Sequence, residues 1–80
     1  MSSVHLHLSF PEHLIDEPVL YTLVRDFDVV PNIKRANVDA TTAWAIVELT
    51  GEPQAIAAAQ AWLTDNGVEM AQIEAPEDGA

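Results

Sequence analysis

Two histidines near the amino terminus are the residues best suited to binding a metal. His5 and His7 lie two residues apart, so in an extended strand both imidazoles point to the same face. Further ligands would have to come from neighbouring strands, with Glu48 and Glu69 as the candidates. Because polar residues at this spacing are common on half-exposed strands, we expect solvated or interface histidines and no metal site.

The other reactive residue types are present but isolated. The chain has no cysteine, which excludes disulfides and thiolate chemistry. Its serines and threonines lie outside any nucleophile motif, and its three glycines form no phosphate-binding loop. Neighbouring carboxylates are better explained as caps and solvated side chains than as an acid–base pair. We therefore expect a protein that is not an enzyme, with no catalytic residue and no cofactor.

The segment from Phe27 to Asp39, FDVVPNIKRANVD, has the features of a recognition edge. Pro31 lies in a run of β-branched residues, and proline, which donates no hydrogen bond, is found mainly on strands at the edge of a sheet. The free N–H and C=O groups of an edge strand can bind a small polar ligand or a second strand. The segment also holds Lys34 and Arg35, two of the three cations of the chain.

Charge and length exclude several classes of partner. The 80 residues carry 13 carboxylates and three basic side chains, for a formal charge of −10. Such a chain repels phosphate backbones and anionic lipids, so we expect no nucleic-acid and no membrane partner. No apolar run approaches the roughly 20 residues of a membrane span, and we expect a cytoplasmic location. A domain of this size buries only about 60% of its unfolded surface, which favours a homodimer.

The spacing of apolar residues predicts six elements. We expect strands over residues 4–10, 29–38, 43–50 and 68–74, and a helix over residues 16–27. A second helix is expected to open at Gly51-Glu52-Pro53 and to stop at Asn66-Gly67. Asp16 is expected to cap the first helix, Gly67 to follow the second, and a bulge to interrupt the second strand around residues 34–36. The order β-α-β-β-α-β predicts an α+β, ferredoxin-like split βαβ fold, with a four-stranded antiparallel sheet and two helices on one face. We expect one domain over residues 1–75 and a short acidic tail over residues 76–80.

The sheet face without helices is predicted to carry an unusual apolar pair. If Leu6 and Leu8 face the helices, the alternation places Trp44 and Ile46 of the third strand on the open face. This face is then more apolar than solvent exposure requires, so we expect a partner to cover Trp44 and Ile46, together with Pro31. For Trp44, a dimer interface, a ligand platform and plain partial exposure carry equal weight.

From Phe10 to Glu74 the chain resembles the NIL domain family, which is named for an Asn-Ile-Leu motif on the second strand. Asn32 and Ile33 match the first two motif positions, and Lys34 replaces the leucine. Other matching segments are Asp16-Glu17-Pro18, Arg25-Asp26-Phe27, Asn37-Val38-Asp39, Val47-Glu48-Leu49-Thr50-Gly51, Ala61-Trp62-Leu63 and Asn66-Gly67-Val68-Glu69. Their order and spacing, over about four fifths of the chain, make the resemblance specific.

The resemblance implies a regulatory module like the one at the C-terminus of bacterial methionine-importer ATPases, here as a stand-alone copy. Such modules bind methionine, and the motif asparagine, Asn32 here, is associated with the ligand site. We therefore expect a methionine-like amino acid at a homodimer interface, bound by Asn32, Ile33, Lys34 and Val38. Lys34 would either bind the ligand carboxylate or point to solvent. The alternative is an interaction module for a transporter or sulfur-metabolism protein, without a small ligand.

Overall fold

The computed structural model describes residues 1–74, so the predicted tail at 76–80 lies outside the described residues. The elements, in chain order, are β1 (Ser2–Phe10), the 3₁₀ helix η1 (Glu12–Leu14), α1 (Val19–Phe27), β2 (Val30–Val38), β3 (Ala43–Gly51), α2 (Pro53–Asp65) and β4 (Glu69–Ile73). The predicted β-α-β-β-α-β order is confirmed, with η1 added between β1 and α1.

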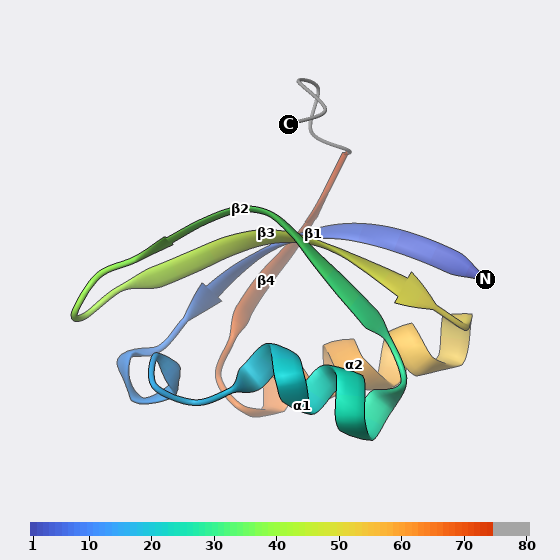
Figure 1. Ribbon diagram of the computed structural model, residues 1–80, viewed down its shortest axis with the longest axis horizontal. Coiled ribbons are helices and arrows are strands. Elements are labelled where there is room, and N and C mark those ends of the chain that lie inside the picture. Colours follow the sequence, from blue (N-terminus) through green and yellow to red (C-terminus); the bar gives the residue numbers. More distant parts are fainter. Residues whose placement is uncertain (75–80) are drawn as a thin grey trace.

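The four strands form one antiparallel sheet in the order β2-β3-β1-β4. Both helices cover the same face, and the opposite face is open (Figure 1). The α+β ferredoxin-like prediction is therefore confirmed. Strand β2 lies at one edge, which is where Pro31 of β2 was expected to place it, and β4 lies at the other edge.

Side chains along the central strands β1 and β3 point alternately to the buried face of the sheet and to its open face. Leu6 and Leu8 of β1 are fully buried under the helices, as are Val47 and Leu49 of β3. The core also takes buried residues from both helices and from the segments that follow them: Val19, Leu23, Val29, Ile56, Ala59, Leu63 and Val68. The predicted inward and outward sets on β1 and β3 are thus confirmed.

A bulge interrupts β2 where the sequence predicted one. The register runs Ile33↔Val47 and then Arg35↔Ile46, so Lys34 is the extra residue between the two pairs. A bulge of this kind leaves one residue unpaired and bends the strand locally. Ile33 therefore shares the helix-side face with Val47, whereas Lys34 reaches the open face.

The first helix begins later than predicted. Its N-terminal boundary residue is Pro18, and no side chain caps the helix, so the prediction that Asp16 caps it is wrong. Pro18 disfavours helical dihedrals at the residue before it, which prevents the helix from including Glu17. The Pro18 carbonyl instead accepts hydrogen bonds from the backbone N–H of Thr22 at 3.0 Å and from its hydroxyl at 3.2 Å.

The helix ends contain the two left-handed residues of the described chain. Asp28 follows α1 with φ 57°. Gly67 follows α2 with φ 92°, which confirms its predicted role at the end of that helix. Left-handed dihedrals suit glycine and are tolerated by aspartate, so both positions turn the chain back toward the sheet at low cost.

Candidate functional site

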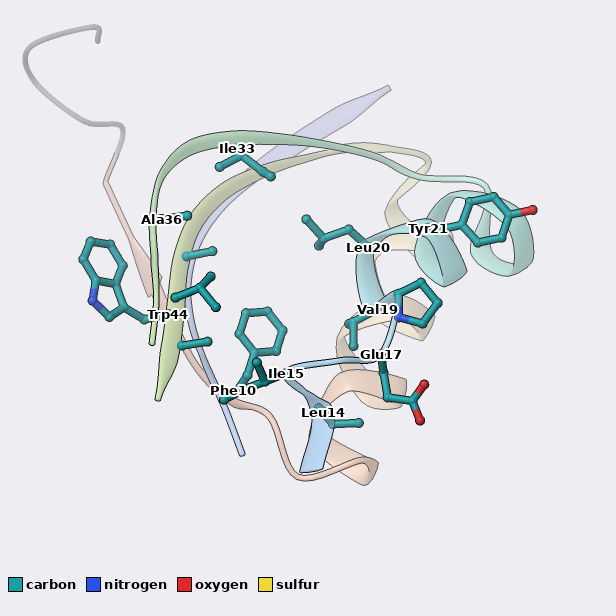
Figure 2. A pocket seen from close by; sticks show the side chains of 14 residues that line it. Phe10, Leu14, Ile15, Glu17, Val19, Leu20, Tyr21, Ile33, Ala36 and Trp44 are labelled. Atoms are coloured by element: carbon teal, nitrogen blue, oxygen red, sulfur yellow. The ribbon is translucent and has the colours of Figure 1, made fainter. Parts of the chain in front are cut away.

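An apolar cavity of about 270 Å³ lies between the edge strand β2 and helix α1. Figure 2 shows Ile33 and Ala36 on its sheet side, with Leu20 on its helix side and Phe10 at its base. Glu17 is the charged residue among those that line it, and its carboxylate points away from the cavity (Figure 2). The cavity can therefore accept an uncharged group, and any charged group of a ligand must remain at its mouth.

Exposed apolar side chains gather beside this cavity. Apart from Met1, every large apolar side chain exposed within residues 1–74 lies on α1 or β2. They are Tyr21 at 58% exposure, Val24 at 49%, Val30 at 52%, Ile33 at 56% and Val38 at 64%. Since β2 is also an edge strand with free backbone groups, this side of the molecule combines apolar surface with unused hydrogen-bonding capacity.

The structure divides the predicted ligand residues between the two faces of β2. Ile33 and Val38 line the cavity on the helix side. Asn32 lies opposite Glu48 in the register, on the open face, and Lys34 also reaches Glu48 there. A ligand can therefore contact both groups only at the free edge of the strand, where the two faces meet.

The predicted interface residues also occupy different places. Pro31 lies opposite Leu49, on the helix side of β2. Trp44 and Ile46 lie on the open face, and both are half-buried. The indole of Trp44 points away from the cavity (Figure 2) and stacks on His7, with ring centroids 5.5 Å apart and planes 16° from parallel.

The open face holds a row of three polar side chains, His5, Glu48 and Lys34, across three strands. The carboxylate of Glu48, on β3, has Oε2 at 3.8 Å from His5 Nε2 and Oε1 at 3.7 Å from Lys34 Nζ. His5 is directly opposite Glu48 in the β1–β3 register. In the part of the chain that the structure describes, no three metal-ligating side chains come together. The arrangement is one carboxylate between an imidazole and an ammonium group.

A charged pair, Arg25 and Asp26, lies beside Tyr21, one of the residues that line the cavity. Arg25 donates hydrogen bonds from Nε and Nη2 to the two carboxylate oxygens of Asp26, at 2.8 and 2.9 Å, and its guanidinium lies 5.4 Å from the ring centre of Tyr21. The hydrogen bond from Arg25 lowers the pKa of the Asp26 carboxyl, and the same pair raises the pKa of Arg25. Tyr21 is thus held at the cavity mouth by a neighbouring cation.

The sequence predicted two residues that line the cavity from β2, Ile33 and Val38, but none of those that line it from η1 and α1. Phe10, Leu14, Leu20 and Tyr21 line the cavity, and the sequence pattern predicts no ligand role for them. The available signal was Tyr21, an apolar residue outside the buried stripe of Val19 and Leu23 on α1. An aromatic side chain on the solvent side of a short helix indicates a surface that another molecule can cover.

Comparison with known families supports the resemblance found in the sequence. The model of the NIL domain matches residues 4–72, from the first strand to the last. The chain belongs to the NIL domain family. As a NIL domain it is a regulatory module rather than a catalytic one.

Solved structures show the same fold. This NIL domain superimposes with a TM-score of 0.76 on the crystal structure of the C-terminal domain of an ABC transporter ATP-binding protein from Enterococcus faecalis. The two chains are 23% identical, and the match covers 91% of this chain and 86% of the other. No curated protein sequence matches this NIL domain. Over residues 1–74, no helix is long and apolar enough to cross a membrane.

Proposed function

We propose that this NIL domain binds a small amino acid with an apolar side chain, such as methionine, at the free edge of β2. The supporting observation is the apolar cavity directly beside an unpaired strand edge. The ligand side chain enters the cavity next to Ile33 and Val38. Its ammonium and carboxylate groups stay at the edge, where backbone C=O and N–H groups and the Asn32 amide can bind them.

The size and polarity of the cavity fit this ligand class. Pockets for drug-sized molecules span about 300–1,000 Å³, so a cavity of about 270 Å³ suits a single amino acid. Since no charged group points into it, the cavity favours an uncharged side chain over an acidic or basic one.

We also propose that two copies of the domain meet at the β2 edge, with the amino acid bound at their interface. The exposed apolar side chains on α1 and β2 favour this edge as the contact. Of the predicted interface residues, Pro31 lies on this edge, whereas Trp44 and Ile46 would contact only a partner that covers the open face. A cytoplasmic location stays a prediction.

The second candidate function is an interaction module for another protein, such as a transporter subunit or a sulfur-metabolism protein. The observation that favours it is the extent of the exposed apolar surface. Val24 and Val30 belong to that surface but do not line the cavity, so a ligand held in the cavity leaves them uncovered. A strand added at β2 would cover more of this side of the molecule.

Thermal and chemical unfolding with and without L-methionine separate the two functions. At about 100 times its dissociation constant, a ligand that binds only the native state adds about 2.7 kcal/mol to the free energy of unfolding. Asn32→Ala should reduce this gain and leave the unliganded stability nearly unchanged, since Asn32 is exposed. Asn37→Ala is the matched control, because Asn37 is also an exposed asparagine on β2 and lies opposite Trp44.

Two results would change the proposal. If millimolar methionine leaves the unfolding transition where it is, the ligand function is wrong and the interaction module takes its place. If Asn32→Ala binds as tightly as the parent, methionine binding stands but its contact with this side chain does not.

A further inference from the structure

We propose that protonation of His5 controls how tightly Lys34 holds the carboxylate of a bound amino acid, with Glu48 as the positioning residue that connects them. The inference deepens the proposed function and rests on it. It concerns the open face of the sheet rather than the cavity.

The three groups form a continuous row across neighbouring strands. Glu48 lies on the central strand β3, between His5 on β1 and Lys34 in the bulge of the edge strand β2. Each carboxylate oxygen faces one base, at 3.8 Å from His5 Nε2 and at 3.7 Å from Lys34 Nζ. The side chains of His5, Glu48 and Lys34 are 18%, 27% and 32% exposed, so solvent screens their interaction less than it screens a fully exposed pair.

Because of the bulge, the Lys34 side chain can point either toward Glu48 or toward the free edge of β2. As the extra residue of an edge strand, it is not fixed by a cross-strand pair on either side. Its ammonium can therefore bind Glu48, as in the structure, or turn toward a carboxylate held at the free edge of β2. Glu48 and the ligand carboxylate compete for the same cation.

The charge on His5 shifts this competition. When His5 is neutral, the Glu48 carboxylate attracts Lys34. When His5 takes up a proton, its positive charge offsets the negative charge of Glu48. The same positive charge also repels the Lys34 ammonium, so Glu48 holds Lys34 less tightly. Lys34 is then more available to the ligand. By linkage, a ligand carboxylate bound to Lys34 must favour protonated His5 to the same extent.

The residues around His5 leave Glu48 as the charged group to which its protonation is coupled. On its other side, β4 places the apolar Ile73 opposite His5, and Glu69 is further along that strand, opposite Ser9. The titratable neighbour on its own strand, His7, stacks on Trp44. On β2, the uncharged Asn32 lies opposite Glu48, and Arg35 lies opposite Ile46, in the row of His7 rather than in the row of His5.

The test is the dissociation constant of L-methionine for the full chain, measured calorimetrically between about pH 5.5 and about pH 8, the range in which imidazoles take up protons. Binding should be about two- to fivefold tighter at the acidic end, the size expected for a partly exposed ion pair. Titrations in two buffers with different heats of ionisation should show proton uptake on binding. L-methioninol, which lacks the carboxylate, should show neither effect.

Substitutions test whether the pH dependence of methionine binding comes from His5, Glu48 and Lys34. His5→Asn should remove both the pH dependence and the proton uptake, whereas His7→Asn, on the same face of the same strand, should keep them. Glu48→Gln should bind equally tightly across the range, because Lys34 is then always available. Lys34→Leu should bind more weakly at the acidic end and lose the dependence.

The outcomes separate this inference from the function on which it rests. Methionine binding that is independent of pH, or a pH dependence that persists in His5→Asn, overturns the role of His5 and leaves the proposed function in place. If methionine does not bind at any pH, both are wrong.

Discussion

Replacing Ile33 by alanine should weaken ligand binding while costing the fold only about 1 kcal/mol. Ile33 is 56% exposed and lines the cavity, so the free protein buries less than half of this side chain. Full burial of an isoleucine is worth about 1.5–3 kcal/mol, which leaves about 1 kcal/mol of stability at stake in the unliganded protein. A ligand or partner that covers the remaining 56% gains about 0.8–1.7 kcal/mol from the contact.

Ile56→Ala is the matched control for this prediction. The substitution is chemically the same, but Ile56 is only 4% exposed and lies in the core on α2. It should cost about 2–5 kcal/mol of unfolding free energy, because it leaves a cavity under the helix. Ile56 does not line the candidate site.

Urea unfolding and calorimetric titration with L-methionine measure the two effects separately. We expect Ile33→Ala to lose about 1 kcal/mol of stability and to bind about four- to eighteenfold more weakly. If Ile33→Ala binds methionine as the parent does, the ligand side chain is not in this cavity. If it unfolds as easily as Ile56→Ala, the exposure of Ile33 has been misjudged.

Three further predictions concern the assembly, a turn and an exposed ion pair. Val38→Glu should shift the sedimentation equilibrium mass toward the 8.7 kDa monomer, whereas Trp44→Glu should leave the dimer intact; the reverse pattern would place the dimer contact on the open face. Gly67→Ala should cost about 1–2 kcal/mol in urea unfolding, because φ is 92° while the added Cβ meets Pro11 Cγ at an ordinary 3.6 Å; an unchanged midpoint would contradict the strain argument. Since Arg25 lowers the pKa of Asp26 in the folded state, their pair stabilises the protein above the usual carboxyl pKa and loses this effect as the pH falls through the lowered value. Arg25→Gln should therefore have a lower urea midpoint than the parent at neutral pH, and the difference should narrow in strong acid, where the contact of Arg25 with the Tyr21 ring remains. A constant difference would refute the linkage.

The fold could be predicted because its signals are local. Strict alternation on β1 and β3 assigns a buried face to each, and Pro31 identifies β2 as an edge before any contact is known. The start of α1 was misjudged because the acidic Asp16 resembled a cap, while the conformational effect of Pro18 on the residue before it decided the boundary.

The candidate site could be predicted only in part. Period-two alternation already places Ile33 and Asn32 on opposite faces of β2, and the structure keeps this separation. The far wall of the cavity depends on how α1 and η1 pack beside the sheet, which is set by tertiary contacts and has no local pattern. The row of His5, Glu48 and Lys34 likewise depends on the register of three strands, and the bulge decides which face Lys34 reaches.

Titration calorimetry of the unliganded protein with L-methionine, repeated at two temperatures, tests the central claim most directly. The account predicts saturable binding with one site per chain and a negative change in heat capacity, since the ligand side chain leaves water for an apolar cavity. No saturable heat at either temperature, up to millimolar methionine, would contradict the claim that this NIL domain binds such an amino acid at the edge of β2.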